Sequence, residues 1–220
     1  KIHCIQASVT DHRKLVKEIF QLAKPHRRDY EFPSDEELYR TYTAVPSVDG
    51  DPPETVFMKR VQHVLPEEVR SSVVDSLFNR YVGEDEELLA NELYMDVAQL
   101  QCMARHGMEI GGHGYSHTWL TQMSRDGQEE EIRRTVSFLA SILGHEPSNW
   151  VMSYPNARYD DVTIELLEQA GCILGLAGDV DLVPDFSTPL ELSRLDTNDL
   201  PFTGNAEICD WTKMAMASTT

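Results

Sequence analysis

Apolar residues recur at helical spacing through the first part of the chain. Leu15, Ile19 and Leu22 share one face of a helix predicted over residues 11–23, and Thr10 stands where a capping side chain is expected. Pro66-Glu67-Glu68 is typical of a first helical turn. The apolar residues that follow it at i, i+4 spacing predict a second helix, which Gly83 ends: Val69, Val73, Leu77 and Tyr81.

Two stretches interrupt this helical pattern. Pro33 and the segment Val45 to Pro53, which holds Asp49-Gly50 and Pro52-Pro53, predict loops. The acidic run Glu84 to Glu87 predicts a further solvated loop.

From residue 95 onward the pattern alternates between helix and strand. The expected helices, each ended by a glycine, cover residues 96–106, 124–144 and 160–170. The expected strands cover residues 108–110, which lead into Gly111-Gly112, and residues 150–154 and 172–176. This alternation predicts a parallel sheet with crossover helices. We therefore expect an α/β fold, a partial or distorted (β/α) barrel over residues 95–220. A mainly helical insertion or cap over residues 1–94 completes a single domain.

Charge narrows the choice of partner. The chain has 37 acidic and 19 basic side chains, a formal net charge of −18. This excess disfavours nucleic acid and anionic membranes as partners, because both attract basic patches. It fits a neutral or cationic ligand, and equally a surface whose charge serves solubility.

The expected cellular compartment follows from two features that the sequence does not show, a membrane helix and a signal peptide. No apolar run approaches the roughly 20 residues of a membrane helix, and no signal peptide is recognisable. The cysteines form no C-x-x-C pair, so reduced, packed thiols in a cytoplasmic protein are expected: Cys4, Cys102, Cys172 and Cys209.

The chemistry-bearing signal is Gly111-Gly112-His113-Gly114-Tyr115-Ser116-His117, which follows a predicted strand. If the chain turns helically here, the two imidazoles share a face and can chelate one metal ion. Neutral imidazole suits zinc and other late first-row metals. Spacing alone favours two hydrogen-bonded loop histidines, and the preceding strand and Gly111-Gly112 add weight to the metal interpretation.

This motif, followed by Leu120 and the helix ending at Gly144, resembles the histidine motif of the polysaccharide deacetylase family (the NodB-homology carbohydrate esterases). The later stretch Ser153 to Asp161 resembles that family's second pocket motif. The resemblance covers residues 95–178 and extends less closely through Leu192 to Asp199.

The resemblance implies a NodB-like barrel and hydrolysis of an N-acetyl group on a sugar, with a divalent metal, zinc by preference. It implies that His113 and His117 bind the metal, whose bound water becomes the nucleophile. The backbone N–H of Asn156 matches an oxyanion donor, and Tyr154 and Pro155 match the pocket wall, for which plain packing is the alternative.

Three departures from the family pattern stand out. The opening Thr-Phe-Asp-Asp-Gly motif, which supplies the base and the third metal ligand, is absent, so we expect a segment upstream of Lys1 to be missing. Four aspartates elsewhere in the chain lack the context to replace it: Asp11, Asp49, Asp51 and Asp96.

The second departure is Ser153, which stands where the family has an arginine; Arg194 or Arg158 is a candidate substitute, and a surface ion pair is the alternative for each. The third is the lack of a late histidine as general acid, since His145 suits a helix C-terminus. Asp196 is a candidate pocket residue, although its turn is also typical of a cap.

Three functions stay open on this basis. The first is a metal-dependent deacetylase of N-acetylated sugars, with Asn156, Arg194 and Asp196 as catalytic candidates. The second is a carbohydrate-binding pseudoenzyme, and the third a metallohydrolase of a linear amide. The helical first part is either a cap over the pocket or a homo-oligomer interface.

Overall fold

The computed structural model describes residues 1–44, 51–61, 65–83, 85–183 and 185–217. The chain divides into two compact units, Lys1–Tyr94 and Met95–Thr220. Within the described residues, no helix is both long and apolar enough to cross a membrane.

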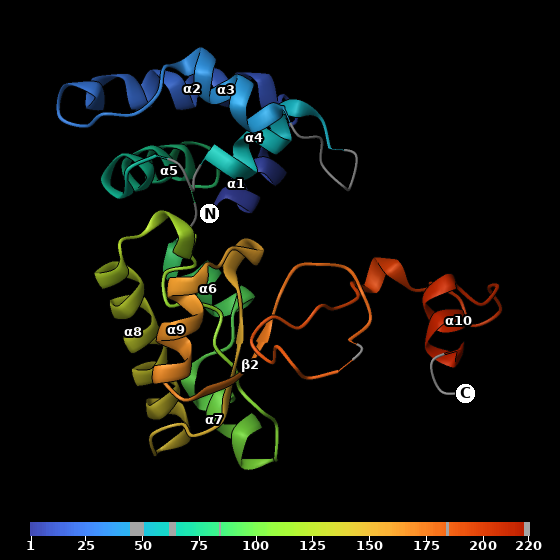
Figure 1. The fold of residues 1–220 in the computed structure, drawn as a ribbon. Helices are drawn as coiled ribbons and strands as arrows, with labels where there is room; N and C mark the ends of the chain where they lie inside the picture. Colours follow the sequence, from blue (N-terminus) through green and yellow to red (C-terminus); the bar gives the residue numbers. More distant parts are fainter. Residues whose placement is uncertain (45–50, 62–64, 84, 184, 218–220) are drawn as a thin grey trace. The chain divides into compact units, whose positions relative to one another are not determined.

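The first unit is built from helices around one apolar core (Figure 1). Helix α2 packs against α4 and α5, α1 packs against α5, and α3 packs against α4. The helices are α1 (Ile2–Ser8), α2 (His12–Ala23), α3 (Asp35–Thr43), α4 (Pro53–Val61), α5 (Glu67–Tyr81) and α6 (Glu86–Leu93), with the 3-10 turn η1 (Lys24–Arg28).

The periodicity predicted α2 and α5 to within a residue, and the predicted faces are the ones that lie inward. Leu15 and Ile19 are buried and Leu22 is partly buried, as expected for the core side of an amphipathic helix. The cap differs from the prediction: Asp11, and not Thr10, accepts a hydrogen bond from the Arg13 N–H.

Two loop predictions in this unit were partly wrong. The acidic run begins α6, because Asp85 caps that helix and its acids lie at the positive end of the helix dipole. Pro53 starts α4 as a first-turn proline and does not lie in a loop. Residues 45–50, and with them Asp49, lie outside the described residues, as does Glu84.

The second unit contains the predicted parallel pair of strands. Strand β1 (Trp150–Ser153) pairs in parallel with β2 (Cys172–Leu176), and α9 (Asp161–Gln169) connects them. Helix α8 (Arg125–Leu143) packs against α9 and against α7 (Val97–Arg105), as Figure 1 shows. Shorter elements follow the chain elsewhere: η2 (Leu120–Gln122), η3 (Pro155–Ala157), η4 (Thr197–Asp199) and α10 (Asp210–Ala217).

The expected sheet is smaller than its sequence pattern indicates. Residues 108–110 are not a strand, and pairing there is reduced to a parallel bridge between Gly112 and Met152. A second parallel bridge joins Leu176 to Leu192 on the other side of β2. The fold is therefore a mixed α/β arrangement around a parallel strand pair.

Helix α8 has a buried polar face that reaches the strand ends. Gln128 is buried, and its side-chain oxygen accepts a hydrogen bond from the Thr163 hydroxyl at 2.6 Å. Its amide nitrogen lies 3.4 Å from Asp160, the residue that caps α9. The first turn of α9 is thus held to α8 by polar contacts inside the unit.

Gly112 packs against α8 and β1 too closely for a side chain. A Cβ at this position would lie 2.8 Å from Thr135 Cγ2 and 2.9 Å from Trp150 Cζ3. Both neighbours are buried and have little freedom to move. Only glycine therefore lets the backbone reach the bridge with Met152.

Gly112→Ala is expected to lower the free energy of unfolding by about 1–3 kcal/mol, because it overpacks a filled site. Chemical denaturation of the two proteins measures the difference. Gly204→Ala is the matched control, since no atom lies within 4 Å of its Cβ position. Equal losses for the two variants would contradict the close packing.

Asp160→Asn is expected to lose stability in a pH-dependent way. Burial opposes the charge, but hydrogen bonds from Thr163 and Gln128 outweigh it and hold the Asp160 pKa below its ordinary value of 3.8. Its charge therefore stabilises the fold above that pH, and the contribution is lost as pH falls through the lower, folded pKa. Urea denaturation of both proteins should show a difference that shrinks in acid; a constant difference would contradict the depressed pKa.

Candidate metal centre

The histidine loop begins at the carboxyl end of β1. The Gly112 N–H donates to Val151 O at 2.8 Å, and the Ser153 N–H donates to Gly112 O at 2.9 Å. These two bonds fix residue 112 beside the strand, so residues 113–117 leave at its end. Functional groups of parallel α/β folds gather at this edge.

The structure brings His113 and His117 together. Their ring centroids are 4.9 Å apart with the ring planes at 62°. His113 Nδ1 lies 2.7 Å from Ser153 O, and because a carbonyl only accepts, the proton is on Nδ1. This leaves the Nε2 lone pair of His113 available, the arrangement usual in metal-binding histidines.

His117 has a strained backbone and a lowered pKa. It has a φ of 58°, in the left-handed region that non-glycine residues rarely adopt. Partial burial, and then the nearby charge of His113, lower the pKa of His117 below its ordinary value. His117 is therefore neutral at neutral pH, the form that binds a metal.

These two imidazoles fit a divalent metal as two of its ligands. Their donor atoms are nitrogen, which zinc accepts readily. Among the described residues, however, no group of three or more His, Cys, Asp or Glu side chains is placed to hold an ion. Within that part of the chain, Asp11 and Asp96 cap helices, and Asp51 pairs with Lys59.

The second motif lies directly against the histidine loop. Gly114 has a φ of 73°, and a Cβ there would lie 3.0 Å from Pro155 Cγ. After Pro155 the chain makes a turn in which Asn156 (φ 53°) and Ala157 (φ 55°) are both left-handed. Such conformations cost about 1–3 kcal/mol each and concentrate at functional sites. Asn156 is exposed on this turn, at the same strand end as His113.

Tyr154 and Pro155 were expected to line the pocket, but both are buried. Tyr154 has 0% exposure, stacks on Tyr159 and donates its hydroxyl proton to Leu190 O at 2.7 Å. Burial also raises the pKa of the Tyr154 hydroxyl, which keeps it neutral. The Tyr154 ring therefore packs inside the unit, next to the turn that begins at Pro155. As a fully buried side chain, it offers no surface to a substrate.

Of the two arginine candidates, Arg194 reaches Ser153. Its Nη1 donates to Ser153 Oγ at 3.2 Å, while the Ser153 carbonyl accepts from His113. Arg158 instead lies over the ring of Trp119, with its guanidinium carbon 5.4 Å from the ring centroid. Arg194 thus stands beside the residue that occupies the arginine position of the motif.

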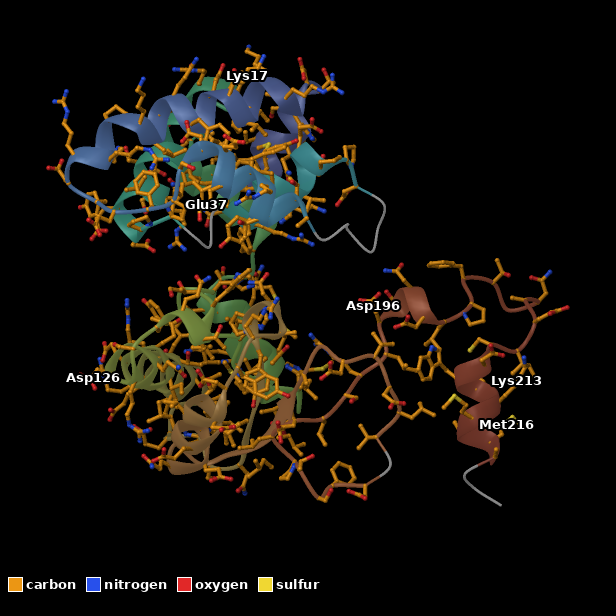
Figure 2. The ribbon with its side chains drawn as sticks, turned by 45° about the horizontal axis from the view of Figure 1, so that its top comes forward. Lys17, Glu37, Asp126, Asp196, Lys213 and Met216 are labelled. Atoms are coloured by element: carbon orange, nitrogen blue, oxygen red, sulfur yellow. The ribbon has the colours of Figure 1, made fainter. Side chains whose placement is uncertain are left out.

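Asp196 has a capping contact in the structure. It accepts a hydrogen bond from the Asn198 N–H at 2.9 Å and forms a capping box with Asp199 at the 3-10 turn η4 (Figure 2). The alternative interpretation of this turn, a cap, is the one that the contacts favour. His145 lies just past the end of α8, and its Nδ1 lies 2.9 Å from Glu146 O.

Sequence reasoning missed Glu131, which contacts the histidine loop from α8. It lies in the run Gln128 to Glu131, which has the composition of a solvated helix face. The available signal was spacing: Glu131 lies on the same helix face as Thr135, Leu139 and Ile142, which are buried.

Comparison with known proteins places these motifs in a family. Residues 73–174 match the polysaccharide deacetylase family. No curated protein matches the chain. The chain is similar to a solved structure, the Streptococcus pyogenes deacetylase PplD in complex with acetate. The two are 18% identical with a TM-score of 0.44, over 82% of this chain and 80% of that one. The resemblance of the histidine and pocket motifs is therefore confirmed: over residues 73–174 the chain carries a segment of the polysaccharide deacetylase family.

Proposed function

We propose that this protein is a metal-dependent hydrolase that removes N-acetyl groups from a sugar or polysaccharide. The family match supports deacetylation as the class of reaction. The observation that carries the finer proposal is the pair of imidazoles, 4.9 Å apart, at the end of β1. We also propose that β1, β2 and their two flanking bridges belong to a distorted (β/α) barrel.

His113 and His117 would hold the metal. Zinc is preferred because it readily binds the nitrogen atoms of neutral imidazole rings. A bound zinc ion would supply Lewis acidity toward the acetamide carbonyl and toward water. The Ser153 carbonyl fixes the His113 tautomer, which keeps one ring nitrogen unprotonated.

The chain's other groups at this edge have roles that follow from their positions. The Asn156 N–H, on the strained turn after Pro155, is the proposed donor to the oxygen of the tetrahedral intermediate. Arg194, which Ser153 holds in place by a hydrogen bond, is proposed to orient a carboxylate of the site. An N-acetylated carbohydrate, which is neutral, also avoids repulsion by a chain of net charge −18.

A carbohydrate-binding protein without catalysis is the second candidate. It is favoured by Ser153, which replaces the motif's arginine, and by the lack of a third ligand among the described residues. In this case the turn and the histidine loop would form a binding surface and perform no proton transfer.

Metal content distinguishes these candidates. The wild type, after zinc loading, is expected to hold about one zinc per chain by elemental analysis, and His113→Ala or His117→Ala to lose it. His145→Ala is the matched control, because this ring lies just past the end of α8, with Nδ1 2.9 Å from the Glu146 carbonyl oxygen.

Acetate release from N-acetylated oligosaccharides, measured on the same proteins, tests the reaction. Loss of zinc should reduce the rate by at least about 100-fold, since no other activator of water is proposed. Saturable oligosaccharide binding that survives His113→Ala, with no acetate released by the wild type, would favour the binding protein. Zinc retained in both histidine variants would refute the site.

A further inference from the structure

Helix α8 presents a buried carboxylate to the loop that bears the two histidines. Glu131 is 4% exposed, although it follows two exposed glutamates in the same helix. Burying a carboxylate is unfavourable unless hydrogen bonds replace its hydration. The hydrogen-bond partners of Glu131 therefore explain why this core position holds a carboxylate and not an apolar side chain.

Those partners belong to the histidine loop. Glu131 Oε1 accepts from the Ser116 N–H at 2.5 Å and from the Ser116 hydroxyl at 3.0 Å. The same oxygen would lie 3.4 Å from a Cβ at Gly114. The Glu131 carboxylate is thus hydrogen-bonded to the loop at Ser116, between His113 and His117.

A second contact from α8 is made to Tyr115, the residue before Ser116. The guanidinium carbon of Arg134 lies 3.8 Å from the centroid of the Tyr115 ring. Glu131 and Arg134 are three residues apart and so share one side of the helix. Ser116 is therefore held from α8 by hydrogen bonds, and Tyr115 by a cation–π contact.

The loop needs such support because its backbone is strained. His117 has a φ of 58°, and the bond that Ser116 makes to Glu131 lies immediately before it. A hydrogen bond to a charged group is stronger than one between neutral groups, and its contribution is comparable to the cost of one left-handed residue. The Glu131 contact is therefore large enough to hold His117 in place.

We propose that Glu131 is a positioning residue that holds the two histidine rings in the orientation needed to share a metal ion. The proposal deepens the proposed function and rests on it for the metal. The orientation of the rings, however, is a property of the metal-free chain and can be measured without metal.

The first test is an NMR spectrum of the imidazole rings in the metal-free, full chain. Glu131→Ala is expected to move the ring signals of His113 and His117 toward averaged, solvent-like positions. Glu131→Gln keeps an acceptor oxygen but loses the charge, so a smaller change in the same direction is expected. Glu130→Ala is the matched control: it lies on the exposed side of the same helix and pairs with Arg133.

The second test is the Co²⁺ affinity of the same variants by titration calorimetry. Glu131→Ala is expected to weaken binding by about 10–100-fold, the usual cost of losing support for a metal ligand. Glu130→Ala should leave the affinity unchanged. Circular dichroism establishes that each variant is folded, and Glu131→Gln decides the matter if Glu131→Ala is not.

The outcomes separate the two proposals. Ring signals and Co²⁺ affinity that match the wild type in both Glu131 variants would overturn the positioning role and leave the metal site standing. Ring signals that move in the Glu131 variants, with no Co²⁺ bound by the wild type, would uphold the positioning role and refute the metal-dependent function.

Discussion

The second unit depends on the buried polar face of α8. Gln128, Glu131 and Thr135 lie along this face, and all three are buried. Gln128 binds the cap of α9, Glu131 binds the histidine loop, and Thr135 packs where Gly112 enters the strand pair. A helix with an apolar face would bury more hydrophobic surface, but it would leave the donors of both loops without partners. The polar face therefore couples helix packing to the geometry of the site.

Strain at the site is sustained by the same packing. Of the left-handed non-glycine residues among those described, His117, Asn156 and Ala157 lie in the two loops at the end of β1, while Asn149 precedes that strand. Conformations of this kind persist only where surrounding contacts outweigh their cost. Here the contacts are the Glu131 carboxylate for one loop, and for the other the buried Tyr154, whose hydroxyl is bonded to Leu190.

Ser153 contributes to the site through both its main chain and its side chain. Ser153 keeps a backbone role, since its carbonyl fixes the His113 tautomer whatever its side chain. Its hydroxyl oxygen accepts a hydrogen bond from the guanidinium of Arg194, a residue that follows β2 in the chain. Because the first contact is made by the main chain, the support of His113 does not depend on which side chain stands at position 153.

The sequence by itself determined the elements and the motif. Local spacing was enough for α2, α5, α8 and α9, and for the parallel strands β1 and β2, because amphipathic periodicity and glycine ends depend on neighbouring residues. Spacing also placed His113 and His117 together on one loop, although the strand expected before them, residues 108–110, is not formed. Tertiary structure alone decided that residues 108–110 shrink to a bridge, that Tyr154 is buried, that Arg194 reaches Ser153, and that Glu131 turns inward. Each of these depends on a partner distant in sequence, and no local pattern encodes the distance between a helix face and a loop that packs on it.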